Sequence, residues 1–200
     1  MDEKIQFQSG GLSIEGLISQ SQGPRGVVIT HPHSLYGGDM YNPVVESIGQ
    51  VYQRRGISTL RFNFRGVGSS QGSFADGIGE QQDVLAAVHW LKEEGLDHID
   101  LAGYSFGAWV NAHIDPDAAD IETLVMVSPP VAFMAFDAGL TLPRLGLVVS
   151  GSQDEIAPPD QIRRLLPGWN PNAVFKEIQD ADHFYFGFFK ELETILAENI

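Results

Sequence analysis

The chain has 200 residues with 43% hydrophobic and 19% charged side chains, as expected for one soluble globular domain over residues 1–200. It has no cysteine, which excludes a disulfide framework, a thiolate nucleophile and a Cys-ligated zinc site. Its net charge of −14 disfavours nucleic acid and anionic membrane surfaces as partners. The polar start Met1–Lys4 leads into no long apolar run, so we expect no signal peptide or spanning helix and a cytoplasmic location.

Short apolar runs alternate with helical patterns along the chain. The first two runs, Ile5–Phe7 and Leu12–Ile18, flank Gly10-Gly11 and predict a hairpin. Six more strands are predicted, at Val27–Thr30, Thr59–Phe64, Ile99–Tyr104, Thr123–Val127, Leu147–Ser150 and Ala173–Ile178. Helices are predicted between them, at 43–55 (after the N-cap Asn42 and closed by Gly56), Glu80–Glu94, Phe106–Ile114, Pro159–Leu166 (halted by Pro167-Gly168) and Gly187–Ala197.

This alternation predicts an α/β fold with a mostly parallel sheet covered by helices on both faces. In such sheets, ligands bind beyond the carboxyl ends of the strands. Candidate functional residues are therefore sought in the loops that follow strands.

The strongest candidate is a serine between a strand and a helix. Gly103-Tyr104-Ser105-Phe106-Gly107 fits the pattern G-x-S-x-G, which forms a sharp strand–turn–helix elbow that exposes a nucleophilic serine. The pattern alone is weak, because glycine is common, and an incidental serine in a glycine-rich turn is the alternative. Its position directly after one predicted strand and before a predicted helix favours Ser105 as nucleophile.

A serine nucleophile needs a base and an acid that orients the base. His183 follows the last predicted strand and Asp154 follows the strand before it, so both lie at the same sheet edge as Ser105. The chain order Ser, Asp, His is the order that the G-x-S-x-G hydrolases use. The weaker alternatives for the base are His31 and His33, and those for the acid are Glu155 and Asp182. The remaining histidines, expected on the surface or in packing, are His89, His98 and His113.

Two backbone amides are expected to stabilise an oxyanion. One is the N–H of Phe106, directly after the nucleophile. The second should come from His31-Pro32-His33-Ser34, the loop after the strand Val27–Thr30. Proline has no N–H, so His33 is the first choice and Ser34 the second.

At this point the sequence resembles the α/β-hydrolase superfamily, and most of all its small lid-less branch, related to the dienelactone-hydrolase-type and prolyl-oligopeptidase-type catalytic domains. The similar segments are the oxyanion loop His31–Met40, the Arg-Gly turn in Arg61–Ser70 and the acid loop Gly151–Pro158. The resemblance implies about eight mostly parallel strands, no cofactor or metal, and acyl transfer to water. Only Ser128–Leu145 is available where many members insert a lid, so no cap domain is expected.

The expected activity is a carboxylesterase-like serine hydrolase acting on small-molecule esters. The residues expected to bind substrate are Ser34, Tyr36, Tyr41, Phe133, Phe136 and Phe184. A thioesterase, peptidase or acyltransferase with the same triad remains an alternative, because all proceed through an acyl-enzyme. A non-catalytic ligand-binding member of the fold is a further alternative.

Overall fold

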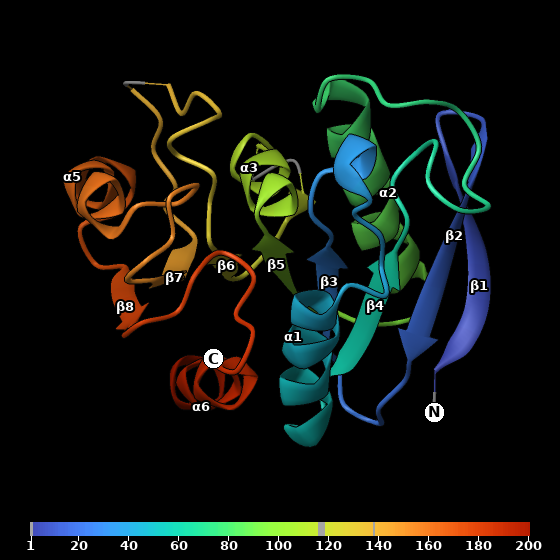
Figure 1. The fold of residues 1–200 in the computed structure, drawn as a ribbon. Coiled ribbons are helices and arrows are strands. Elements are labelled where there is room, and N and C mark those ends of the chain that lie inside the picture. The colour runs from blue at the N-terminus through green and yellow to red at the C-terminus, as the bar shows by residue number, and fades with distance from the viewer. Residues whose placement is uncertain (1, 116–118, 138) are drawn as a thin grey trace.

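A single eight-stranded sheet runs through the protein (Figure 1). The computed structural model describes residues 2–115, 119–137 and 139–200. Its strands are β1 (Glu3–Ser9), β2 (Leu12–Ser19), β3 (Arg25–Thr30), β4 (Ser58–Phe62), β5 (His98–Tyr104), β6 (Leu124–Val127), β7 (Leu145–Gly151) and β8 (Val174–Ile178). Its helices are the short 3₁₀ helix η1 (Ser34–Tyr36), α1 (Pro43–Arg54), α2 (Ile78–Glu93), α3 (Phe106–Ala112), α5 (Pro159–Trp169) and α6 (Phe189–Asn199).

The strand order is β1-β2-β4-β3-β5-β6-β7-β8. β1 and β2 form the predicted hairpin, and β2 pairs antiparallel with β4. All the remaining neighbours pair in parallel. The predicted α/β fold with an eight-stranded, mostly parallel sheet is confirmed, and the carboxyl ends of β3 to β8 meet at one edge.

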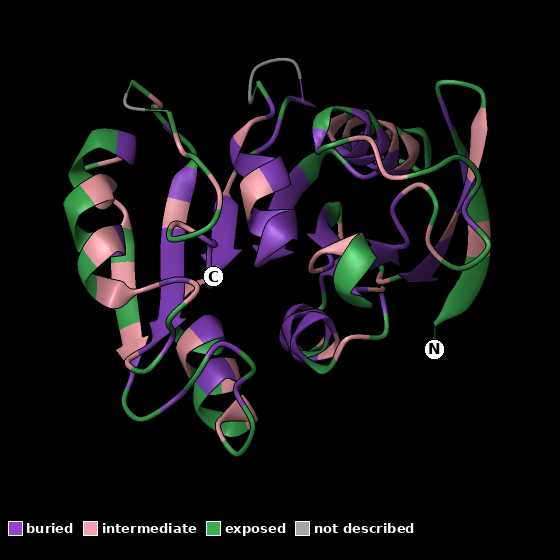
Figure 2. Ribbon diagram, turned by 45° about the horizontal axis from the view of Figure 1, so that its top comes forward, coloured by how far each residue is buried: buried purple, intermediate pink, exposed green. Residues whose placement is uncertain are grey.

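Helices cover both faces of the sheet, which Figure 1 shows as two layers. The apolar sides of α1 and α6 pack on one face, and those of α2, α3 and α5 pack on the other. The central strands are therefore buried on both sides, as Figure 2 shows for β5, β6 and β7. Burial of each large apolar side chain stabilises the fold by about 1.5–3 kcal/mol, so this sheet is a rigid base for the loops at its carboxyl edge.

Many predicted element ends differ from the structure by one to three residues. β4 ends at Phe62 rather than Phe64. The last helix begins at Phe189 rather than Gly187, because Gly187 has a φ of +86° and leaves the right-handed helical region. The helix predicted to stop at Leu166 continues through Pro167 to Trp169. The buried Trp169 packs at 4.9 Å from the Phe136 ring, and this tertiary contact holds a last turn that proline alone would disfavour.

The connection between β6 and β7 forms no cap over the site in the residues that the structure describes, as expected. Residues 128–137 and 139–144, the described part of this connection, contain turns and no helix.

Within the described residues, no helix combines the length and the hydropathy needed to cross a membrane.

Candidate active site

The backbone at Ser105 is strained. Ser105 lies between β5 and α3 with a φ of +54°, a region that residues with a side chain rarely adopt. Its N–H donates to the carbonyl of Val127 at 2.9 Å, and its carbonyl accepts from the N–H of Trp109 at 3.1 Å. The elbow is thus tied both to β6 and to α3, which fixes the direction of the Ser105 side chain.

The two glycines of the motif are required by close backbone contacts. A Cβ on Gly103 would lie 2.6 Å from the amide nitrogen of Ala108, and a Cβ on Gly107 would lie 2.5 Å from Oγ1 of Thr30. Both distances are too short for non-bonded atoms. The absence of side chains lets α3 begin directly against β3 and β5.

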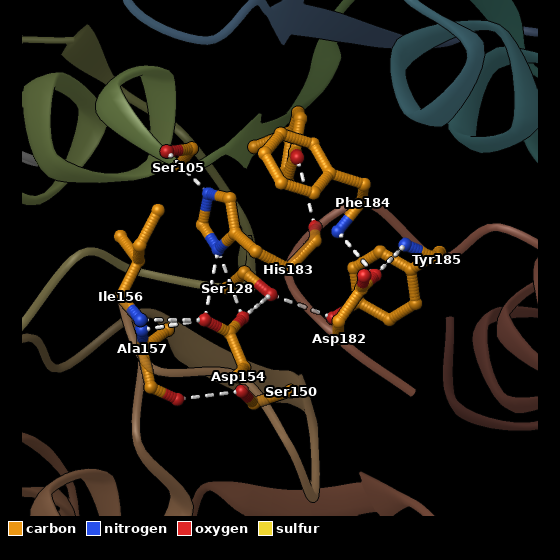
Figure 3. A network of polar contacts seen from close by, with 11 residues as sticks. Ser105, Ser128, Ser150, Asp154, Ile156, Ala157, Asp182, His183, Phe184 and Tyr185 are labelled. Carbon is orange, nitrogen blue, oxygen red and sulfur yellow. Dashed lines mark hydrogen bonds and ion pairs between the residues drawn. The ribbon is translucent and has the colours of Figure 1, made fainter. Parts of the chain in front are cut away.

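Ser105, His183 and Asp154 form a hydrogen-bonded row (Figure 3). The Nε2 atom of His183 lies 3.0 Å from Oγ of Ser105. Its Nδ1 atom lies 2.9 Å and 3.0 Å from the two carboxylate oxygens of Asp154. An ionised carboxylate only accepts, so Nδ1 carries the proton and Nε2 is free to accept the proton of Ser105. All three residues are at least nine-tenths buried.

The carboxylate of Asp154 is well supplied with donors. Its Oδ1 atom accepts from the backbone N–H groups of Ile156 at 2.9 Å and Ala157 at 2.7 Å. Its Oδ2 atom accepts from the hydroxyl of Ser128 at 2.7 Å. Burial by itself would raise the pKa of Asp154, but the hydrogen bonds from His183, Ser128 and Ala157 and the charge of the imidazole outweigh it and lower the pKa. Asp154 therefore stays ionised opposite His183.

The two amides expected to hold an oxyanion lie on residues that touch each other. The His33 ring packs 4.6 Å from the Phe106 ring and 4.9 Å from the Phe74 ring. Neither the His33 nor the Phe106 N–H donates to an acceptor in the part of the chain that the structure describes. The pKa of His33 is lowered by burial despite the nearby charge of Glu80, which favours a neutral ring beside the amides.

His31 plays a structural part in this loop rather than that of a base. It is fully buried, and Nδ1 donates to the carbonyl of Pro32 at 2.6 Å. With that tautomer, Nε2 accepts from the N–H of Phe64 at 3.0 Å. Burial lowers the pKa of His31 to about 4. The neutral ring joins the loop after β3 to the loop after β4.

Comparison with known proteins agrees with this geometry. A sequence model of the alpha/beta hydrolase family matches residues 27–193. The chain belongs to the alpha/beta hydrolase family. This hydrolase is 32% identical over 196 residues to an uncharacterized protein of Rickettsia prowazekii, across 91% of the chain and 82% of that protein.

Solved structures place the hydrolase near lid-less serine hydrolases. An alpha-beta serine hydrolase homologue from Coxiella burnetii is 35% identical, with a TM-score of 0.90 over 98% of this chain and 96% of that one. A serine hydrolase without a lid from Xanthomonas campestris is 28% identical, with a TM-score of 0.90 over 98% of this chain and 92% of that one.

Four of the residues expected to bind substrate are exposed aromatics on loops at the carboxyl edge. They are Tyr36 and Tyr41 after β3, Phe133 after β6 and Phe184 after β8. The Phe184 ring stands perpendicular to the imidazole of His183, with 5.6 Å between the ring centroids. The hydroxyl of Ser34 is buried and has no hydrogen-bond partner among the residues that the structure describes.

Phe136 differs from these four aromatics in that it is half-buried. Its ring packs against Trp169 and, at 5.8 Å, against His113. It also lines a hollow of about 320 Å³ between its own loop and α5, together with residues such as Met134 and Arg164. The structure thus places Phe136 in packing against α5, while the other candidate aromatics stay open to solvent.

Two hydroxyl residues at the site were missed by the sequence reasoning. Ser128 is the first residue after β6, and its hydroxyl bonds Asp154. Tyr185 lies two residues after His183, and its hydroxyl lies 2.7 Å from Oγ of Ser128. In the sequence, Ser128 is marked by its position directly after β6, the strand that pairs with β7, and Asp154 follows β7. No local pattern marks Tyr185.

The other histidines lie away from Ser105. His98 begins β5 at the opposite edge, and His89 is exposed on α2. His113 caps the end of α3, where its Nδ1 donates to the carbonyl of Trp109 at 2.7 Å. Within the described residues, no group of three or more His, Cys, Asp or Glu side chains is arranged to hold a metal ion.

Proposed function

We propose that this hydrolase cleaves carboxylic esters of small acyl groups through an acyl-enzyme on Ser105. The observation that carries the proposal is the 3.0 Å contact between Oγ of Ser105 and Nε2 of His183, with Nδ1 of the same ring bonded to a buried carboxylate. A serine hydroxyl is a weak nucleophile until a base removes its proton. Here His183 is the base, and Asp154 both fixes its tautomer and provides the opposite charge for the imidazolium.

The reaction takes place in two halves. His183 takes the proton of Ser105 as Oγ attacks the acyl carbon, and the N–H groups of Phe106 and His33 stabilise the oxyanion. His183 then protonates the leaving alcohol as the ester bond breaks. In the second half, His183 deprotonates a water molecule that attacks the acyl-enzyme. His183 then returns this proton to Oγ of Ser105 as the bond to the acyl carbon breaks and the acid is released. Asp154 stabilises the imidazolium that forms in both halves.

The charges around the site favour a neutral or cationic substrate. The loops at residues 31–42, 152–158 and 179–188 follow β3, β7 and β8 and contain no Lys or Arg. Arg65, in the loop after β4, donates two hydrogen bonds to Asp83 at 3.0 Å and 2.8 Å. The same loops carry several carboxylates, namely Asp39, Asp76, Glu155, Asp180 and Asp182. In these four loops an anionic substrate would meet like charges, and their one Arg or Lys, Arg65, is already paired with Asp83.

The open edge of the sheet favours a short substrate. Without a lid, an acyl chain can be covered only by the loop side chains around Ser105. Phe184, Phe133, Tyr36 and Tyr41 are among the exposed large apolar side chains of these loops. We expect them to contact the acyl or alcohol group, which would give a preference for short chains with some apolar character.

The test is hydrolysis of p-nitrophenyl esters from acetate to octanoate, with a fluorophosphonate probe located by mass spectrometry. The parent protein should turn over the short esters and carry the adduct on Ser105. Ser105→Ala should lose the adduct and several orders of magnitude in turnover. Ser69→Ala, which removes an exposed hydroxyl from the neighbouring loop after β4, is the matched control and should behave as the parent.

The other results separate the alternative functions. An adduct on Ser105 without ester turnover would indicate a competent nucleophile with another acyl substrate, and thioesters, peptide esters and acyl acceptors would be tried next. Neither adduct nor turnover in a folded protein would refute the proposal and favour a ligand-binding role.

A further inference from the structure

Two buried hydroxyls continue the hydrogen-bonded row beyond Asp154. The hydroxyl of Ser128 donates to Oδ2 of Asp154 at 2.7 Å. The hydroxyl of Tyr185 lies 2.7 Å from Oγ of Ser128. Ser128 and Tyr185 have no exposed surface, so water does not compete for these bonds. Figure 3 shows Ser128 between Asp154 and the loop that carries His183.

The direction of each bond follows from the number of protons. Ser128 has one hydroxyl proton, and the ionised carboxylate of Asp154 can only accept it. Tyr185 must then donate its own proton to Oγ of Ser128. Burial raises the pKa of Tyr185 well above its usual value, so this proton is present at every working pH. The bonds therefore run from Tyr185 to Ser128 to Asp154, while His183 donates to the same carboxylate from the other side.

Both residues hold backbone conformations that favour glycine. Ser128 has a φ of +46° and Tyr185 a φ of +58°. A residue with a side chain in this region costs of order 1 kcal/mol or more relative to glycine. Strained residues of this kind cluster at functional sites. Both side chains end in a hydroxyl. That of Ser128 bonds Asp154 directly, and that of Tyr185 bonds the Ser128 hydroxyl.

We propose that Tyr185 and Ser128 are positioning residues that hold the Asp154 carboxylate in the orientation that His183 requires. The inference rests on the proposed role of His183 as the base. Among the described residues, Oδ2 of Asp154 without the Ser128 hydroxyl keeps one donor, the Nδ1–H of His183. The carboxylate is then less well solvated, and it attracts the imidazolium form of His183 more strongly. Loss of the donor also removes a restraint on carboxylate rotation.

Few other titratable groups face this cluster. Tyr104 on β5 donates its hydroxyl proton to the backbone carbonyl of His183 at 2.8 Å, and burial raises the pKa of Tyr104. Asp182 accepts from the N–H groups of Phe184 and Tyr185. Tyr104 therefore offers a matched control, because its hydroxyl is buried and bonded beside His183 but does not reach the carboxylate.

The experiment compares Ser128→Ala, Tyr185→Phe and Tyr104→Phe. The first readout is the pH titration of the His183 ring by NMR, together with its downfield Nδ1 proton resonance. The second is the acidic limb of kcat/KM for the best ester. In Ser128→Ala, we expect both midpoints to move up by about 0.5–1 pH unit, because only part of the effect of the bond lost at Asp154 is passed on to His183. Tyr185→Phe should move them in the same direction by less, and Tyr104→Phe should leave them in place.

Equal midpoints in Ser128→Ala and the parent would overturn the proposal, as would equal shifts in Ser128→Ala and Tyr104→Phe. If Ser128→Ala does not fold, Ser128→Gly removes the hydroxyl while it tolerates the left-handed backbone, and it should show the same shift. The NMR titration needs no turnover. A protein without esterase activity would thus refute the proposed function, while the ring titration would still decide the role of Ser128 and Tyr185.

Discussion

A Cβ atom on Gly107 would lie 2.5 Å from Oγ1 of Thr30 and 2.7 Å from the Thr30 carbonyl carbon and oxygen. The first turn of α3 therefore rests directly on the end of β3. This contact brings the elbow of Ser105 beside the loop that begins at His31, and hence beside the amide of His33. The second glycine of the G-x-S-x-G motif thus positions the nucleophile relative to the expected oxyanion site.

Gly107→Ala should consequently damage both stability and activity. The new methyl group must push α3 away from β3, and overpacking of this kind typically costs about 1–3 kcal/mol. We expect a lower free energy of unfolding in urea and a fall in kcat/KM of about tenfold or more. Gly168→Ala is the control, since no atom lies within 4 Å of its added Cβ in α5. It should match or slightly exceed the parent in stability. Equal stability of the two variants would contradict the contact.

Asp154→Asn should reduce turnover far more than it reduces stability. An amide in place of the carboxylate can donate to Nδ1 of His183, which favours the wrong tautomer and leaves the imidazolium without its counter-charge. A loss of about 10³–10⁴ in kcat is expected, as for the same change in other serine hydrolases with this triad. The neighbouring Glu155 is exposed, so Glu155→Gln should stay within about twofold of the parent. A small loss in Asp154→Asn would exclude Asp154 as the acid.

The buried His31 predicts an acid-sensitive fold. The folded pKa is about 4, below the ordinary value of 6.5, so the unfolded chain takes up a proton first as the pH falls. The contribution of neutral His31 to the free energy of unfolding is fully present above about pH 6.5. It falls by roughly 3 kcal/mol between about pH 6.5 and pH 4. Urea unfolding at several pH values measures this slope.

Variants isolate the contribution of His31 from those of other groups. Burial raises the pKa of Asp100, which makes the fold more stable as the pH falls and so opposes the effect of His31. The quantity compared is therefore the difference in unfolding free energy between each variant and the parent at each pH. His31→Gln should be less stable than the parent at pH 8 and should approach it as the pH falls to 4. His89→Gln, at an exposed histidine of α2, should keep the slope of the parent. If the free energy of unfolding of His31→Gln falls with pH as steeply as that of the parent, His31 is not buried in its neutral form.

The acidic loops predict selection against anionic esters. p-Nitrophenyl butyrate and p-nitrophenyl hemisuccinate are of similar length, but only the hemisuccinate carries a carboxylate. We expect kcat/KM to be about 5–20-fold lower for the hemisuccinate at low ionic strength, with a gap that narrows as salt is added. A hemisuccinate rate equal to or above that of butyrate would require a cation that the loops do not supply.

Phe184→Ala should weaken the binding of longer acyl chains. Phe184 is 54% exposed and its ring meets His183, so a chain bound at Ser105 can cover it. Loss of one or two methylene contacts, at about 0.8 kcal/mol each, should raise KM for the octanoate about 4–15-fold and leave that for the acetate near the parent value. Val174→Ala, at an exposed residue where β8 begins, should change neither. If Phe184→Ala has the same KM as the parent for every ester of the series, Phe184 is not part of the acyl site.

Local patterns in the chain determine the elements and their order. Apolar runs rich in β-branched residues mark the strands, and caps such as Asn42 with Pro43 mark the helix starts, because these preferences arise within a few residues. Parallel crossover units bring the ends of β5, β7 and β8 to one edge. For that reason Ser105, Asp154 and His183 were assigned to that edge from the sequence, and the structure brings them into hydrogen-bonding contact.

Tertiary contacts decided the rest. α5 continues past Pro167 to Trp169 because Trp169 packs against Phe136. The same contact holds Phe136 against α5. The hydroxyls of Ser128 and Tyr185, 57 residues apart, meet at Asp154 only once β6, β7 and the loop after β8 are assembled. Residue type and spacing specify which side chains reach an edge of the sheet, whereas hydrogen bonds and ring contacts between distant segments depend on packing that no local pattern encodes.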